Sequence, residues 1–186
     1  ADGHVSADDV LFLRKNVFAD GVVSRAELAA LFALAEKAPQ GDPEWADYFA
    51  EASADFFLRE EEPHGYLTDQ EFEHLEAFVT RDGKKASAIE LQLLVRLMEK
   101  ATATPPAMAE FVADQFRRLI RERKGGARIA RNDADLLRRY LYASAGDGSI
   151  AVTKEEAELL FDLHEMTYAA DNDPSWADLF IKAVAA

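Results

Sequence analysis

The hydrophobic positions of the chain recur with the spacing of a helix. Leu28, Leu31, Phe32 and Ala35 fall at i, i+3, i+4 and i+7, which places them along one helical face. The segment 88–101 carries the same stripe. No segment shows a convincing strand pattern. We therefore expect an all-α fold.

Polar residues mark where these helices begin. In a capping box, a Ser or Thr hydroxyl and a carboxylate three residues later satisfy each other's backbone N–H groups. The chain fits this motif at Ser24 with Glu27, Thr68 with Glu71 and Ser87 with Glu90, and it places Asp42 and Asp173 as N-caps before a proline. About nine helices are expected, at 7–18, 25–38, 43–58, 69–80, 88–101, 106–122, 133–143, 155–168 and 174–186.

The predicted helices belong to an internal repeat. PEWADYF at 43–49 returns as PAMAEFV at 106–112 and as PSWADLF at 174–180. A second matching segment precedes each of them, so the chain divides into three three-helix repeats at about 3–62, 65–124 and 126–186. We expect residues 1–186 to form a single all-helical domain, with Trp45 and Trp176 as core anchors at matching points.

A glycine-led phrase opens several of these segments. It reads GHVSADD at 3–9, DGVVSRAE at 20–27 and GYLTDQE at 65–71. With a helix on either side, the phrase resembles the second half of the EF-hand calcium loop, in which glycine makes the turn and an acid closes the loop. In the loop ending at Glu27 the resemblance fails, because Phe18 stands where calcium needs an oxygen.

The second loop, residues 60–71, keeps enough acidic groups for a weak divalent-cation site. The EF-hand resemblance assigns its ligands to Glu60, Glu62, His64, Thr68 and Glu71, with Ca²⁺ as the ion. The same residues also have a purely structural interpretation, which we favour. Glycine permits the positive φ that ends one helix, and the hydroxyl and acid cap the next.

Charge is distributed unevenly along the chain. The net charge is −14, from 21 basic and 35 acidic residues. Segment 40–76 holds 12 acids and one base, whereas segment 117–139 holds nine bases and three acids. Arginines suit a carboxylate or phosphate partner. The candidate basic tract is Arg117, Arg118, Arg121, Arg123, Lys124 and Arg128.

Other function classes find little support in the sequence. The overall acidity disfavours nucleic acid, and no segment predicts a membrane helix. Glu71 and His74 form one E-x-x-H motif without the second that a di-metal site needs, which favours a solvated acidic face. His164 lies on an apolar stripe, as a core or edge histidine. With no cysteine and no nucleotide-binding loop, no enzyme is expected.

These patterns predict a protein-interaction or scaffold module that orients a protein partner, or a second copy of itself, through its charge asymmetry. A divergent EF-hand-like protein with one divalent-cation site at 60–71 and an unrecognised enzyme are the alternatives. The cytoplasm is the default compartment. The chain begins with Ala1 rather than Met, which is compatible with a removed segment, and we expect the natural chain to continue beyond Ala186.

Overall fold

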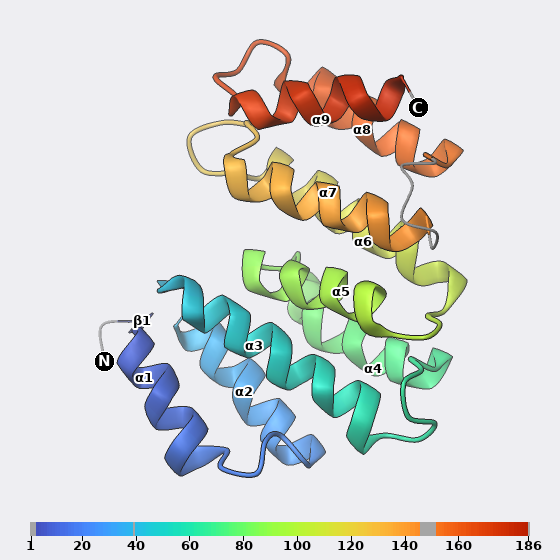
Figure 1. Ribbon diagram of the computed structural model, residues 1–186. Coiled ribbons are helices and arrows are strands. Elements are labelled where there is room, and N and C mark those ends of the chain that lie inside the picture. The colour runs from blue at the N-terminus through green and yellow to red at the C-terminus, as the bar shows by residue number, and fades with distance from the viewer. Residues whose placement is uncertain (1–2, 39, 146–151, 186) are drawn as a thin grey trace. The chain divides into compact units, whose positions relative to one another are not determined.

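The computed structural model describes residues 3–38, 40–145 and 152–185, and it confirms the all-α fold. This described part contains nine α-helices (Figure 1). They are α1 (Ala7–Phe12), α2 (Arg25–Lys37), α3 (Pro43–Asp55), α4 (Asp69–Val79), α5 (Ala88–Lys100), α6 (Pro106–Arg121), α7 (Arg131–Ala145), α8 (Lys154–Thr167) and α9 (Pro174–Val184).

The ends of some helices differ from the prediction. The expected helices 7–18 and 43–58 each change to a π-helical turn before they end, at Leu13–Val17 and Phe56–Glu60. A 3₁₀ turn, Arg81–Gly83, follows α4. The second of these π-helical turns carries the buried residues Phe56, Phe57 and Leu58, whereas the first carries no buried residue.

The chain falls into two compact units. One is Ala1–Pro105, which contains α1 to α5, and the other is Pro106–Ala186, which contains α6 to α9. The boundary therefore lies inside the second sequence repeat, between its second and third helices. The single-domain assignment of residues 1–186 stays a prediction.

The three sequence repeats share one backbone feature that the sequence did not predict. In the first, the two-residue strands β1 (His4–Val5) and β2 (Gln40–Gly41) pair in parallel. In the second, Tyr66 forms a parallel bridge with Ala103. In the third, the N–H of Asp173 donates to the carbonyl of Ile129 at 2.9 Å. Each repeat thus ties the loop before its first helix to the loop before its third.

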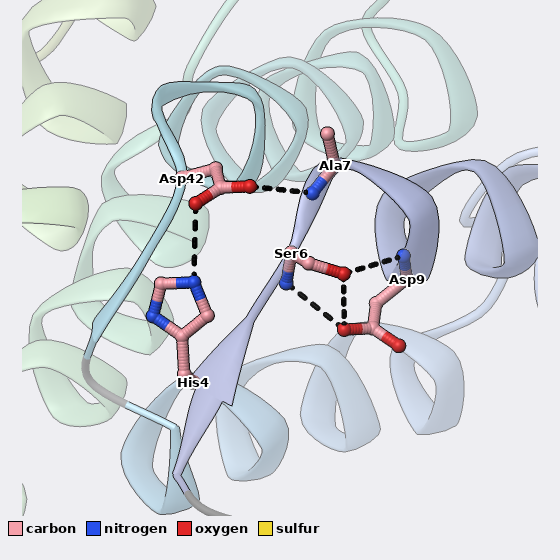
Figure 2. Close-up of polar contacts among 5 residues, drawn as sticks. All are labelled: His4, Ser6, Ala7, Asp9 and Asp42. Atoms are coloured by element: carbon pink, nitrogen blue, oxygen red, sulfur yellow. Dashed lines mark hydrogen bonds and ion pairs between the residues drawn. The ribbon is translucent and has the colours of Figure 1, made fainter.

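Figure 2 shows this tie in the first repeat. The Asp42 carboxylate accepts a hydrogen bond from the Ala7 N–H at 2.9 Å and another from His4 Nε2 at 3.1 Å. These bonds hold the pKa of Asp42 below its usual value, the Ala7 bond contributing most. Asp42 occupies the N-cap position of α3, but its side chain does not cap α3 as the sequence suggested. It secures the start of α1 instead.

The capping motifs are largely as predicted. Thr68 with Glu71 and Ser87 with Glu90 form complete capping boxes. Ser24 accepts from the Glu27 N–H, but the Glu27 carboxylate bonds the N–H of Val23 rather than that of the cap residue. Further boxes, not singled out from the sequence, start α1 at Ser6 with Asp9 (Figure 2) and α8 at Thr153 with Glu156.

Large apolar side chains fill the interior of each unit. Trp45 is 1% exposed and Trp176 is 2% exposed, which confirms both as core residues. In the first unit α3 packs against α5, and in the second α6 packs against α8. The third helix of one repeat thus packs against the second helix of the next, and the same relation recurs in both units.

Candidate functional site

The loop predicted to bind calcium is organised around the start of α4. Glu71 Oε2 accepts hydrogen bonds from the Thr68 N–H at 2.6 Å and from Thr68 Oγ1 at 2.7 Å. His64 Nε2 lies 3.0 Å from Glu62 Oε1, and both side chains are exposed. Gly65 has a φ of 82°, a left-handed value that favours glycine. These are the contacts of the helix-capping interpretation.

The structure does not gather the five predicted metal ligands around one point. Glu60 is exposed at the end of its π-helical turn, whereas Glu71 is 4% exposed beneath the cap. Across the described residues, no three His, Asp or Glu side chains lie close enough together to hold a metal ion. The calcium hypothesis stays a prediction.

A small cavity lies beside Glu71, in the first compact unit. It has a volume of about 110 Å³, and its apolar lining is Leu28, Phe56, Phe57 and Phe78. We call it the Glu71 cavity. The interpretation of Glu71 as part of a solvated acidic face is wrong, because Glu71 is buried and lines this space.

Charged groups complete the lining of the Glu71 cavity. Arg25 donates to both carboxylate oxygens of Glu61, at 2.8 and 2.9 Å. That pairing holds the pKa of Glu61 below its usual value. His74, one helical turn after Glu71, is exposed and lines the same cavity. Glu71 and His74 of the E-x-x-H motif therefore line the same cavity as the Arg25–Glu61 ion pair, which comes from other elements.

Glu71 carries a buried oxygen with no donor. Oε2 is used in the capping box, but Oε1 is inaccessible to solvent and has no hydrogen-bond partner. Glu156, in the capping box of α8, has the same unsatisfied Oε1. The unsatisfied oxygen is therefore a recurrent result of this capping geometry. In the first unit, the cavity described above lies beside Glu71.

Half of the predicted basic tract forms ion pairs within its own unit. Arg123 contacts Asp133 at 2.7 Å, where the two side chains are 21% and 10% exposed. Arg117 contacts Asp162 at 2.7 Å. Arg118 lies near Glu122, at 3.6 Å. The Arg117 contact links α6 to α8, and the Arg123 contact links the segment after α6 to α7.

The other members of the basic tract are more accessible. Arg121, Lys124 and Arg128 are exposed, and Lys124 lies in the turn that follows α6. The Arg128 carbonyl accepts a hydrogen bond from Arg123. Three of the six cations thus form ion pairs within the unit, and the other three are exposed.

A second candidate surface, which the sequence did not predict, lies on α8 and α9. Phe161 is 54% exposed, Ile181 is 66% exposed and Val184 is 51% exposed. Phe180 joins the two helices, with its ring 5.5 Å from Phe161 and stacked 4.5 Å from the ring of His164. We call these five residues the α8–α9 face. His164 is exposed rather than part of the core.

The α8–α9 face borders a hollow at its loop end. This space has a volume of about 480 Å³, and His164, Phe180 and Ile181 line it together with Tyr168. Tyr168 is 76% exposed. The hollow extends the apolar surface from the two helices onto the loop between them.

The repeat alignment shows that this exposure is unusual. Phe161 aligns with Phe32 and Val95, Ile181 with Ala50 and Ala113, and Val184 with Ser53 and Phe116. All six aligned residues of the first two repeats are buried, at 0–3% exposure. The third repeat therefore exposes a surface that the other two bury.

Aromatic residues from the following repeat cover the equivalent surfaces. The ring of Phe78 in α4 stacks on Phe32 at 4.8 Å. Tyr140, which aligns with Phe78, lies 5.7 Å from Phe116 and donates a hydrogen bond to the Ala109 carbonyl. The α8–α9 face belongs to the third repeat, the last in residues 1–186.

Comparison of the chain with models of protein families, with curated proteins and with solved structures gave no match. None of the described helices is long and apolar enough to cross a lipid bilayer.

Proposed function

We propose that the protein is an interaction module whose α8–α9 face binds an amphipathic helix pair from a protein partner. One observation carries this proposal: Phe161, Ile181 and Val184 are exposed at positions that both other repeats bury. Large apolar patches on a protein surface are typical of interaction sites.

In the first two repeats, helices of the following repeat cover the surface equivalent to the α8–α9 face. These helices indicate the geometry of the partner. Phe78 and Tyr140 indicate an aromatic residue on its first helix. The second helix of a covering pair brings leucines at i and i+4, since Leu93 and Leu97 in α5, and Leu159 and Leu163 in α8, are all 0% exposed. The partner is expected to carry the same combination.

The partner's charge follows from the surroundings of the face. Segment 154–184 holds eight acidic and two basic residues. Lys154 and Lys182 are both ion-paired within their own helices. A partner helix with basic flanks therefore complements this surface and is steered toward it.

A second copy of the chain fits this description less well. Its α1 carries Asn16 at the position of Phe78 and Tyr140, and its α2 carries exposed Ala30 at the position of Leu93. Two α8–α9 faces meeting each other would bring two acidic segments together. Both arrangements disfavour self-association as the main use of the face.

The proposal is tested by selection from a displayed library of helix pairs against the wild-type protein. We expect the enriched sequences to combine an aromatic residue, leucines at i and i+4 and a net positive charge, and to lose binding to Ile181→Asp. Phe12→Asp is the matched control, because Phe12 is 59% exposed on α1.

Three results would overturn the proposal. The library could yield no binders, or binders that tolerate Ile181→Asp. Sedimentation could instead reveal a dimer of the wild type that Ile181→Asp dissociates, in which case the occupant is a second copy.

A further inference from the structure

We infer that Glu165 selects the partner of the α8–α9 face by pairing with two cations in the turn after the partner's first helix, in the pattern aromatic-x-x-Arg-x-x-Lys. This inference rests on the proposed function. It begins with a position that the three repeats share. Glu36, Glu99 and Glu165 align, and each lies in the last turn of the second helix of its repeat.

The first repeat shows what this glutamate binds when the surface is covered. Glu36 Oε1 accepts a hydrogen bond from Lys84 Nζ at 2.7 Å, and Glu36 Oε2 lies 3.4 Å from Arg81 Nη2. Both cations belong to the following repeat, where Arg81 comes three residues after Phe78 and Lys84 three residues later. The Lys84 hydrogen bond and the charge of Arg81 hold the pKa of Glu36 below its usual value. One carboxylate thus anchors the turn after the covering helix.

The third repeat resembles the first more closely than the second at the covered surface. Three positions are aromatic in the first and third repeats and aliphatic or methionine in the second. They are Trp45, Phe32 and Phe49 in the first, Trp176, Phe161 and Phe180 in the third, and Met108, Val95 and Val112 in the second. The cover of the second repeat also has Ala143 at the position of Arg81. The cover of the first repeat is therefore the template for the partner.

Glu165 is available for such a contact. It is exposed, and among the described residues it has no hydrogen-bond or ion-pair partner. Asp162, about one turn earlier, is already held by Arg117 at 2.7 Å. A carboxylate in the last turn of a helix lies near the negative end of the helix dipole, which disfavours it unless cations are close. The following repeat supplies these cations to Glu36, and the partner supplies them to Glu165.

Two contacts fix the register of the partner on the face. In the first repeat, the ring of Phe78 stacks on Phe32 at 4.8 Å, and Arg81 Nη2 lies 3.5 Å from the carbonyl oxygen of the same Phe32. An arginine three residues after the partner's aromatic residue therefore reaches both Phe161 and Glu165. A partner displaced by one helical turn, about 5.4 Å, would lose one of these contacts.

The test uses the helix pairs that the displayed library yields against the wild-type protein. We expect the enriched sequences to carry Arg three residues after the aromatic residue and Lys three residues after that Arg. Glu165→Gln should weaken their binding by about fivefold, as two partly exposed ion pairs imply, and the loss should shrink at high salt. Glu155→Gln is the matched control, because Glu155 is exposed on the same helix. Its effect should stay within about twofold.

An exchange of charges separates pairing from packing. Glu165→Lys should weaken binding by about tenfold or more, because it brings like charges together. Replacing the Arg and the Lys of a selected helix pair by Glu should restore binding to the Glu165→Lys protein and weaken binding to the wild type. Loss of packing alone would not be restored in this way.

The inference is wrong if helix pairs that lose binding to Ile181→Asp carry no such cations, or if they tolerate Glu165→Gln as well as Glu155→Gln. It is also wrong if the exchange of charges restores no binding. In each of these cases the proposed function stands without it. If no selected helix pair depends on Ile181, the proposed function and the inference fail together.

Discussion

Phe161 occupies in the third repeat the position that Phe32 occupies in the first, and the two rings differ completely in exposure. Phe32 is 0% exposed and stacks on Phe78 at 4.8 Å, whereas Phe161 is 54% exposed. The same residue type at aligned positions is thus core in one repeat and surface in another. What differs is whether a following pair of helices covers it.

This difference predicts opposite effects of one substitution at two aligned positions. Ala50→Asp should destabilise the protein by about 3 kcal/mol or more, because Ala50 is 0% exposed and the new charge would be buried without a partner. Ile181→Asp should change the free energy of unfolding by no more than about 0.5 kcal/mol, because Ile181 is 66% exposed. Urea denaturation of the two variants measures both. Equal losses would show that Ile181 is buried in solution.

The tie between Asp42 and Ala7 predicts a dependence of stability on pH. The folded pKa of Asp42 lies below the unfolded value of 3.8, mainly through the Ala7 hydrogen bond. Its stabilising contribution is therefore fully present above the unfolded pKa and is lost as pH falls through the folded pKa. Asp42→Asn should lower the unfolding midpoint at pH 6, and the difference from wild type should shrink below about pH 4.

The matched control for that measurement is Asp171→Asn. Asp171 is exposed in the loop before α9. We expect its effect on the midpoint to be small at every pH. A constant difference between wild type and Asp42→Asn from pH 6 down to pH 3 would contradict the assignment of a paired carboxylate.

The basic tract should divide by mutation into structural and exposed members. Arg123→Ala should cost about 1.5–3 kcal/mol, because it leaves Asp133, whose side chain is 10% exposed, without its charged partner. Arg121→Ala should cost less than about 0.5 kcal/mol, since Arg121 is exposed. Thermal unfolding distinguishes them. If both changes are neutral, the 2.7 Å contact does not persist in solution.

The EF-hand resemblance predicts a gain of stability with metal, and the contacts of the loop predict none. Glu71 Oε2 is used by Thr68, and Glu62 lies beside His64. We therefore expect the same unfolding midpoint in EDTA and in excess Ca²⁺ or Mg²⁺, because only a ligand that binds the folded state raises it. A Ca²⁺-specific rise that Glu71→Gln abolishes would instead support the calcium alternative.

The sequence predicted the helix-capping motifs well, because the two residues of each motif lie close together in the chain. Thr68 and Glu71 are three residues apart, and their capping box forms as expected. The role of Asp42 was missed because its partner Ala7 lies 35 positions earlier. The burial of Glu71 was missed for a related reason: the cavity depends on α2 and on the turn after α3, which a reading of α4 alone does not include.

The α8–α9 face left a signal in the sequence that a closer comparison of the repeats could have found. Ile181 replaces two alanines, Ala50 and Ala113, although the aligned positions belong to the same packing surface. Asn16 likewise replaces the aromatic residues found later at Phe78 and Tyr140. Residue type alone could not establish exposure, because exposure depends on which helices follow.

The boundary between the two compact units, after Pro105, does not coincide with a boundary between sequence repeats. Gene duplication would copy a stretch such as 3–62, but the compact part that begins there extends to Pro105 and includes the next repeat's first two helices. Loss of the second copy, 65–124, would therefore remove α4 and α5 from one compact part and α6 from the other. Shortening such a protein is harder than its sequence symmetry implies, because α3 packs against α5 and α6 packs against α8, and each of these pairs joins two repeats.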